Sequence, residues 1–313
     1  MAGADLEGEE RVGVLTDIRA TILDTIGRTP LVRINRLFSK PGVQILAKLE
    51  AFNPLGSVKE RIALAMVEGM EREGAIRPGM TLVESSSGNT GIGLAMVGAV
   101  KGYRVLIAMS KKVSVERRKM LEALGADVVL VDGGSDDAWD RADAITAAAP
   151  GKYVRVNQYR SAHNVRIHYE TTGPEIWEQA GGDVAALVAT LGTTGTIVGA
   201  GRYLREKNPD VRIVAVQPDA KEHAQMGIRT LRHQRVPPIW DAGAVDETIE
   251  VGDEEAFRLA RELARVEGIF GGISCGTAMA GALRVAQRLA AGNVVAIFPD
   301  RGEKYLSTAL YGG

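Results

Sequence analysis

Lys59 is the residue whose position most clearly suggests chemistry. It follows a predicted strand over residues 43–49 and stands at the start of a predicted helix. Ser57 and Glu60 have the spacing of a capping box, so we expect that helix to begin beside them. Free N–H groups and the helix dipole at such a start lower the pKa of a lysine. An amine with a lowered pKa is suited to forming a Schiff base, although a solvated surface lysine would show the same local pattern.

A first polar loop joins a predicted strand to a predicted helix at residues 86–90. Its hydroxyl and amide groups, next to the free N–H groups of a helix start, could hold a carboxylate. A solvated turn with a serine or asparagine capping the helix is the alternative. The residues that would bind are Ser86, Ser87, Asn89 and Thr90.

A second loop repeats this arrangement with more glycine, in the order Gly192, Thr193, Thr194, Gly195, Thr196. Glycines let successive N–H groups converge, and threonine hydroxyls add donors, which suits a phosphate monoester. The loop lacks the Gly-Lys-Ser/Thr ending of a nucleotide-binding P-loop. A tight strand-to-helix turn without a ligand remains the alternative.

Ser274 is the central residue of a Gly-x-Ser-x-Gly pattern at residues 272–276, which is typical of serine hydrolases. The hydrolase order requires a histidine after the serine, but all four histidines precede it. Ser274 is therefore interpreted as a hydroxyl that meets a ring nitrogen, or as an ordinary helix cap. We expect Cys275 to be a small buried residue. No cluster of residues has the spacing of metal ligands, so no metal site is predicted.

These residues must be positioned by strands and helices that alternate along the chain. This alternation predicts an α/β protein with parallel sheets and right-handed crossovers, and a ligand cleft between two halves. The pattern restarts after Gly151. We expect strands at residues 43–49, 80–84, 103–109, 128–131, 185–191, 211–216 and 294–298, and helices at 61–73, 92–101, 114–124, 172–179, 197–207, 254–267 and 277–289.

Composition limits the classes of function. The chain has 313 residues, 45% of them hydrophobic, and a net charge of -1. Nothing indicates binding to nucleic acid or to an anionic membrane. No apolar run is long enough to span a bilayer, and the acidic start has no signal-peptide core, so a cytoplasmic location is expected. Residues 1–20 are predicted to form a disordered extension.

The order and spacing of these features resemble the cysteine synthase family of fold-type II pyridoxal-phosphate enzymes. The resemblance extends from Ile22 to Tyr311 and includes three further segments, at residues 26–32, 168–175 and 299–308. It implies two three-layer α/β domains with mostly parallel twisted sheets, as in the tryptophan synthase β-subunit. Residues 53–160 would form a smaller, mobile domain for the substrate carboxylate. Residues 21–52 and 161–313 would form a larger domain for the cofactor phosphate.

By position, the resemblance implies a role for each candidate residue. Lys59 would be the Schiff-base lysine and the general acid and base. Asn89 would lie beside the cofactor ring, and Ser274 would face its pyridine nitrogen. The substrate carboxylate would be bound by Ser86, Ser87, Asn89, Thr90 and Gln158, and the cofactor phosphate by Gly192, Thr193, Thr194, Gly195 and Thr196.

The activity implied is the synthesis of L-cysteine from O-acetyl-L-serine and sulfide, or another sulfur donor, through an α-aminoacrylate intermediate. The cofactor would be pyridoxal 5′-phosphate, and the enzyme a homodimer, with a serine acetyltransferase or a sulfur-carrier protein as further partners. Cystathionine β-synthase or serine dehydratase chemistry is an alternative on the same scaffold. A non-catalytic binding protein that kept the scaffold is an alternative of another class.

Details of the second loop resemble the B type of cysteine synthase, which has Gly-Thr-Thr-Gly-Thr. The chain departs from the family pattern at Ser86, where threonine is usual, and at Ser110, where proline is usual. Residues 227–232 lack the tryptophan common in B types that use thiosulfate. They contain Arg229 and Arg232, which are either solvated charges or an arginine site for a substrate phosphate. O-phosphoserine therefore stays open as a donor beside O-acetylserine.

Overall fold

The computed structural model describes residues 18–86 and 88–312. The predicted N-terminal extension lies outside this range up to position 17, and so does Ser87. In the described part of the chain, no helix is long and apolar enough to cross a membrane.

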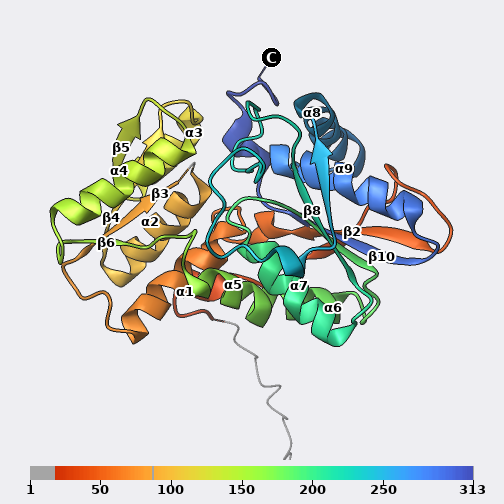
Figure 1. Cartoon of the computed structure of the whole chain (residues 1–313), viewed down its shortest axis with the longest axis horizontal. Coiled ribbons are helices and arrows are strands. Elements are labelled where there is room, and N and C mark those ends of the chain that lie inside the picture. The colour runs from red at the N-terminus through yellow and green to blue at the C-terminus, as the bar shows by residue number, and fades with distance from the viewer. Residues whose placement is uncertain (1–17, 87, 313) are drawn as a thin grey trace, which may run out of the picture.

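Two separate sheets form the framework (Figure 1). The smaller sheet has the strand order β5-β4-β3-β6 and is parallel throughout. The larger sheet has the order β1-β2-β10-β7-β8-β9, and only its edge strand β1 runs antiparallel. The strands are β1 (Leu31–Arg33), β2 (Val43–Leu49), β3 (Thr81–Ser85), β4 (Arg104–Ser110), β5 (Asp127–Val131), β6 (Tyr153–Arg155), β7 (Ala186–Thr190), β8 (Arg212–Pro218), β9 (Glu247–Val251) and β10 (Gly292–Phe298).

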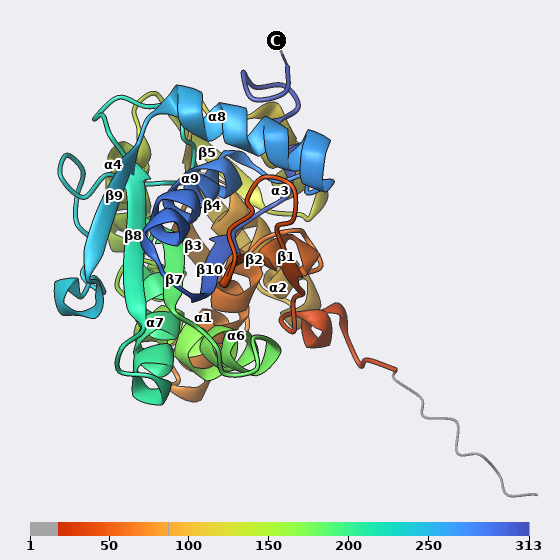
Figure 2. The same ribbon diagram turned by 90° about the vertical axis from the view of Figure 1, so that its right-hand side faces the viewer.

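Helices cover both faces of each sheet, as expected where parallel strands are joined by crossover helices (Figures 1 and 2). The α-helices are α1 (Lys59–Arg72), α2 (Asn89–Lys101), α3 (Val115–Ala123), α4 (Ser135–Ala148), α5 (Ala162–Ile167), α6 (Gly173–Gln179), α7 (Gly195–Lys207), α8 (Asp253–Glu262) and α9 (Ile273–Arg288). A π-helical turn, η3 (His168–Thr172), connects α5 to α6, and a second, η5 (Leu263–Glu267), extends α8. The predicted fold class of two three-layer α/β units with mostly parallel sheets is confirmed.

Apolar side chains from the sheets and helices form separate cores on the two sides of each sheet. Alternate residues of β7 and β8 point to opposite faces, so Val188 and Val214 pack under α8 and α9, whereas Leu187 and Ile213 pack under α7. The smaller sheet has one large core under α1, α2 and α3, and a small one under α4. Because both faces of each sheet are buried, the strand sequences are continuous apolar runs and do not alternate between apolar and polar residues.

Most predicted elements agree with the structure to within a few residues. The predicted helix at residues 254–267 is α8 followed by η5. Five strands and α-helices were missed: β1, α4, β6, α5 and β9. Their patterns are weak because α4 buries only Ala138, Trp139 and Ala142 over 14 residues, and β6 and α5 are very short. A short or mostly exposed segment has too few apolar positions to reveal its period.

Candidate active site

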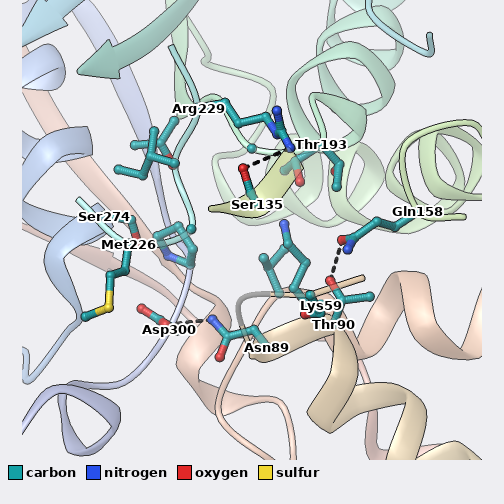
Figure 3. A pocket seen from close by; sticks show the side chains of 18 of the residues that line it. Lys59, Asn89, Thr90, Ser135, Gln158, Thr193, Met226, Arg229, Ser274 and Asp300 are labelled. Carbon is teal, nitrogen blue, oxygen red and sulfur yellow. Dashed lines mark hydrogen bonds between the residues drawn. The ribbon is translucent and has the colours of Figure 1, made fainter. Parts of the chain in front are cut away.

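One cavity collects polar loops from both sheets (Figure 3). Its walls are built where β3 and β7 end and the helices α2 and α7 begin, which is where ligands bind in open α/β sheets. The sequence-predicted residues that line it are Lys59, Ser86, Asn89, Thr90, Gln158, Gly192, Thr193, Thr196, Arg229 and Ser274. Thr194 and Gly195 lie within the same loop as three of them. Ser87 lies outside the described residues.

Lys59 is the first residue of α1, as predicted. Only half of the predicted capping box forms: the Ser57 N–H donates to Glu60 Oε1 at 2.8 Å, but Ser57 Oγ accepts the N–H of Lys59, at 3.3 Å, and the residue that caps the helix is Val58. Burial lowers the pKa of the Lys59 amine to about 8, although the charge of Asp300 acts in the opposite direction. The expected direction of the shift agrees with the structure, but removal from water is its largest cause.

The first loop, residues 86–90, is shaped by the hydroxyl of Ser86. Its Oγ accepts the N–H groups of Gly88 and Gly91 at 3.0 and 3.1 Å. Gly88 has φ +140°, and a Cβ there would lie 2.5 Å from Arg117 Cδ, so the position requires glycine. This holds the loop tightly against the start of α2. Ser86 therefore has a structural task in addition to facing the cavity.

Gln158 joins the first loop from the far side of the cavity. The Thr90 hydroxyl donates to Gln158 Oε1 at 2.6 Å, and Gln158 Nε2 donates to the Ser85 carbonyl at 2.7 Å (Figure 3). The backbone N–H of Gln158 donates to Glu84 Oε2 at 2.8 Å. Gln158 is thus held at both its backbone and its side chain. A carboxylate entering here would find these groups already oriented.

Asp300 is a residue of the cavity that sequence reasoning did not single out. Its Oδ2 accepts a hydrogen bond from Asn89 Nδ2 at 2.7 Å (Figure 3). It also accepts one from the Tyr305 hydroxyl at 2.8 Å. Lys304 Nζ donates to the other side of the same amide, Asn89 Oδ1, at 2.9 Å. The side chain of Asn89 is therefore held by two groups of opposite charge. The only signal in the sequence was the segment at residues 299–308, which was noted as a whole.

The second loop, residues 192–196, leads directly into α7. Thr194 has φ +73°, an uncommon conformation for threonine, and its Oγ1 is buried with no hydrogen-bond partner among the described residues. Thr193 and Thr196 are also buried, and both line the cavity. His168 Nε2 lies 3.1 Å from Thr196 Oγ1. A helix start with three hydroxyl groups, one of them unsatisfied, fits a phosphate group.

Ser274 is the second residue of α9, and it lines the cavity while only 6% exposed. The neighbouring Cys275 is 1% exposed, and burial strongly raises the pKa of its thiol. Its Sγ donates to the Asp300 carbonyl at 3.4 Å. A thiol with a raised pKa is a poor nucleophile, so Cys275 is the small buried residue that we expected. Among the described residues, no group of three or more histidine, cysteine or acidic side chains could hold a metal ion.

The two loop arginines occupy different surroundings. Arg229 is 3% exposed and donates to Asp136 Oδ1 on α4 from both Nη atoms, at 3.0 Å each. Its guanidinium lies 4.7 Å from the ring centroid of Tyr159, so it is not a solvated charge. Arg232 does not line the cavity; its side chain is 63% exposed and pairs with Glu250 at 3.0 Å. Of the two readings left open for Arg232, this geometry favours the solvated charge, because the side chain turns toward Glu250 of β9.

The arrangement as a whole fits a cofactor that carries a carbonyl group and a phosphate. Lys59 offers an amine of lowered pKa, the second loop offers donors for a phosphate, and Ser274 offers a hydroxyl at another wall. The first loop with Gln158 offers a place for an amino-acid carboxylate.

Comparisons with known proteins agree with this arrangement. The family model described as "Pyridoxal-phosphate dependent enzyme" matches residues 22–300. Cysteine synthase B of Pseudomonas aeruginosa is 45% identical over 93% of this chain and 97% of that protein. Cysteine synthase B of Escherichia coli is 44% identical over 94% and 96%.

Solved structures give the same result. The cysteine synthase of Entamoeba histolytica superimposes with a TM-score of 0.89 at 36% identity, covering 99% of this chain and 94% of that chain. O-ureido-L-serine synthase superimposes with a TM-score of 0.88 at 40% identity, covering 95% and 96%. With matches over nearly the whole length, this chain belongs to the cysteine synthase family of pyridoxal-phosphate dependent enzymes.

Proposed function

We propose that this chain makes L-cysteine by replacing the acetate group of O-acetyl-L-serine with sulfide or another sulfur donor. The observation that carries the proposal is that one amine, Lys59, and two anion-binding loops face the same cavity. An amino acid whose carboxylate is bound at the first loop then lies in the same cavity as the cofactor phosphate, which is held at the second loop. The reacting carbons are then confined beside the lysine.

The residues take the following parts in this proposal. Lys59 is the lysine joined to pyridoxal 5′-phosphate, and it is also the general acid and base. Asn89 and Ser274 contact the cofactor ring, and the phosphate is held by Gly192, Thr193, Thr194, Gly195 and Thr196. The substrate carboxylate is held by Ser86, Ser87, Asn89, Thr90 and Gln158. When bound, the cofactor ring takes up the negative charge that develops at the α-carbon.

Proton transfer is the task of Lys59. Its amine takes the proton from the α-carbon, and acetate leaves from the β-carbon. Sulfide then forms the new C–S bond at the β-carbon, and Lys59 returns the proton to the α-carbon. A pKa of about 8 suits both directions near neutral pH, because the amine exists in both forms. Ser274 contributes a neutral hydroxyl rather than a carboxylate, which does not hold the ring nitrogen protonated and so favours β-replacement over transamination.

Lys59→Ala tests the central assignment. The variant should fold but lose turnover, and borohydride reduction of the wild-type holoenzyme should place the pyridoxyl group on the peptide that contains Lys59. A label on another lysine, or wild-type activity in Lys59→Ala at saturating substrate, would contradict the proposal. Assays with sulfide and with homocysteine separate cysteine synthesis from cystathionine β-synthase chemistry, and pyruvate formation reveals serine dehydratase activity. A chain that binds no cofactor would be a non-catalytic relative.

O-phosphoserine is the second candidate donor because Arg229 lines the cavity. A guanidinium is well suited to a phosphate, but here its charge is already paired with Asp136. O-acetylserine is therefore the donor that this geometry supports better. Steady-state kinetics with the two donors side by side test the choice.

In this proposal residues 53–160, which contain the smaller sheet and the first loop, form one unit. This unit moves relative to a second unit made of residues 21–52 and 161–313. Closure of the smaller unit on a bound carboxylate would keep water away from the reacting carbons. The distance between labels at Arg104 and Arg212, both exposed, should shorten on adding substrate. We further propose a cytoplasmic homodimer, which light scattering and fractionation test directly.

A further inference from the structure

Asn164 is a fully buried residue of α5 that stands behind the second loop. Its Nδ2 lies 2.8 Å from the Gln158 carbonyl oxygen and 3.0 Å from Thr193 Oγ1. A backbone carbonyl only accepts hydrogen bonds, so the amide must present its nitrogen to Gln158. Both hydrogens of that nitrogen are then used, one toward each partner.

This fixes the direction of the hydrogen bond at Thr193. The Thr193 hydroxyl accepts from Asn164, so its own hydrogen is left to donate to a third group. Thr193 lines the cavity, and a hydroxyl whose hydrogen is free to donate there suits an anion. Asn164 therefore determines the polarity of a group in the second loop without itself lining the cavity.

The packing around Gly195 places Asn164 firmly against the same loop. A Cβ at Gly195 would lie 2.0 Å from Asn164 Oδ1, far inside contact distance. Oδ1 is buried and has no hydrogen-bond partner among the described residues. An unsatisfied buried oxygen is costly, so the favourable contribution of the Asn164 amide at this position comes from the two hydrogen bonds of Nδ2.

The other end of this connection reaches the first loop. Asn164 bonds the backbone of Gln158, whose side chain bonds Thr90 and the Ser85 carbonyl. A continuous chain of hydrogen bonds thus joins the first loop to the second through Gln158 and Asn164. The two loops come from different sheets, so Asn164 sets the spacing between them.

We infer that Asn164 is a positioning residue that couples the cofactor-phosphate site to the substrate-carboxylate site. It orients Thr193 as a donor and holds Gln158 in place with one amide nitrogen. This rests on the proposed function and adds to it a residue that touches neither ligand. Removing the amide should therefore weaken both sites together, which a residue serving only one of them would not do.

The experiment compares the wild-type holoenzyme with Asn164→Asp and Asn164→Ala. Asp keeps the shape but cannot donate, and Ala removes the group without adding charge. A matched control is Asn208→Asp at the far end of α7, where the amide donates to the Val184 carbonyl at 3.4 Å and accepts the Asp210 N–H at 3.1 Å, outside the cavity. The measurements are the dissociation constant of pyridoxal 5′-phosphate, that of phosphate-free pyridoxal, the ³¹P resonance of the bound cofactor, and KM and kcat for O-acetylserine.

We expect both Asn164 variants to bind pyridoxal 5′-phosphate roughly 10- to 100-fold more weakly, because the Thr193 hydroxyl is no longer oriented to donate to the charged phosphate, and hydrogen bonds to charged groups are worth about this much. Pyridoxal binding should change little, the ³¹P resonance should shift, and KM should rise about 10-fold with a smaller fall in kcat. Asn208→Asp should behave as wild type. Unchanged phosphate binding, or an unchanged KM, in a folded Asn164→Ala enzyme would overturn the inference.

Two further results keep the tests separate. Should both Asn164 variants fail to fold, Thr193→Val removes the hydroxyl that Asn164 orients, and the coupling then requires KM for O-acetylserine to rise along with the weaker binding of pyridoxal 5′-phosphate. A wild-type protein that binds no pyridoxal 5′-phosphate would defeat the proposed function itself. Normal cofactor binding by the wild type together with no effect of the Asn164 variants would defeat only the coupling role.

Discussion

Asn89 at the start of α2 and Asp300 after β10 are 211 residues apart in the chain, yet Asn89 Nδ2 lies 2.7 Å from Asp300 Oδ2. Lys304 holds the other side of the same amide. The side chain of Asn89 is thus oriented by a segment of the chain that follows the last strand. The C-terminal segment, not the first loop alone, defines this part of the cavity.

Asp300→Asn should lower kcat by roughly 10- to 100-fold, because Asn89 loses its strongest acceptor and the usual cost of removing such supporting groups is of this order. Tyr305→Phe removes one hydrogen bond to Asp300 but keeps its charge, so its effect should be several-fold smaller. Steady-state kinetics with thermal unfolding as the folding control check this. Wild-type kcat in a folded Asp300→Asn enzyme would show that Asn89 needs no carboxylate.

Lys59 should make the stability of the cofactor-free protein depend on pH. Its pKa is about 8 in the folded chain and 10.5 when unfolded, so the unfolded state binds more protons between these values. The free energy of unfolding should therefore rise with pH from about 8 to about 10.5, by roughly 3 kcal/mol at 1.4 kcal/mol per unit. Below about pH 8 the full cost of burying a charged amine is present.

Urea unfolding of the cofactor-free wild type and Lys59→Met over this pH range isolates the contribution. The difference between the two proteins should change with pH by about the stated amount, since other groups cancel. Equal pH profiles would mean that the amine is not taken out of water. Adding Asp300→Asn should move the rise to lower pH, because the charge of Asp300 raises the pKa of Lys59.

Asp136 should control whether Arg229 can serve a phosphorylated substrate. In the structure the guanidinium is neutralised by Asp136 at 3.0 Å. Asp136→Asn frees its charge, so kcat/KM for O-phosphoserine should rise about 5- to 10-fold while that for O-acetylserine changes less than 2-fold. The double variant Asp136→Asn with Arg229→Met should lose the gain. Arg232→Ala is the control and should affect neither donor, because the residue lies outside the cavity.

Glu175 should make the fold sensitive to acid. It pairs with Arg61 and Lys48, each at 2.7 Å. Burial alone would raise the pKa of Glu175, but the hydrogen bonds and charges of Arg61 and Lys48 outweigh it and lower the pKa to about 2. The ionised form is thus favoured in the folded state, and its stabilisation is complete above pH 4.5 and is lost as pH falls toward 2.

Glu175→Gln should cost about 3 kcal/mol of unfolding free energy near neutral pH and progressively less at low pH. Glu170→Gln is the matched control, because Glu170 forms an exposed pair with Arg166 and such pairs contribute less than about 1 kcal/mol. Chemical denaturation at about pH 7 and about pH 3 separates the two. A constant difference across pH for Glu175→Gln would refute the assignment.

The sequence by itself determined the class of fold and most of the site. Apolar runs separated by helical patterns are a local property, so the strands β2, β7 and β10 were predicted closely. The lysine and the two loops are also local, since each combines turn residues with a helix start. Their order along the chain then identified the family, which the comparisons confirmed.

Only the tertiary structure decided how residues distant in the chain meet. Asp300 is one aspartate among many in the sequence, and its contact with Asn89 depends on how β10 pairs between β2 and β7. Arg229 and Arg232 look alike as loop charges, but one is buried beneath α4 and the other is exposed. Asn164 lies in a helix too short to predict, and its role appears only when two loops from different sheets meet at one amide. Charge, burial and hydrogen-bond direction are set by neighbours in space, which the pattern of a single chain does not specify.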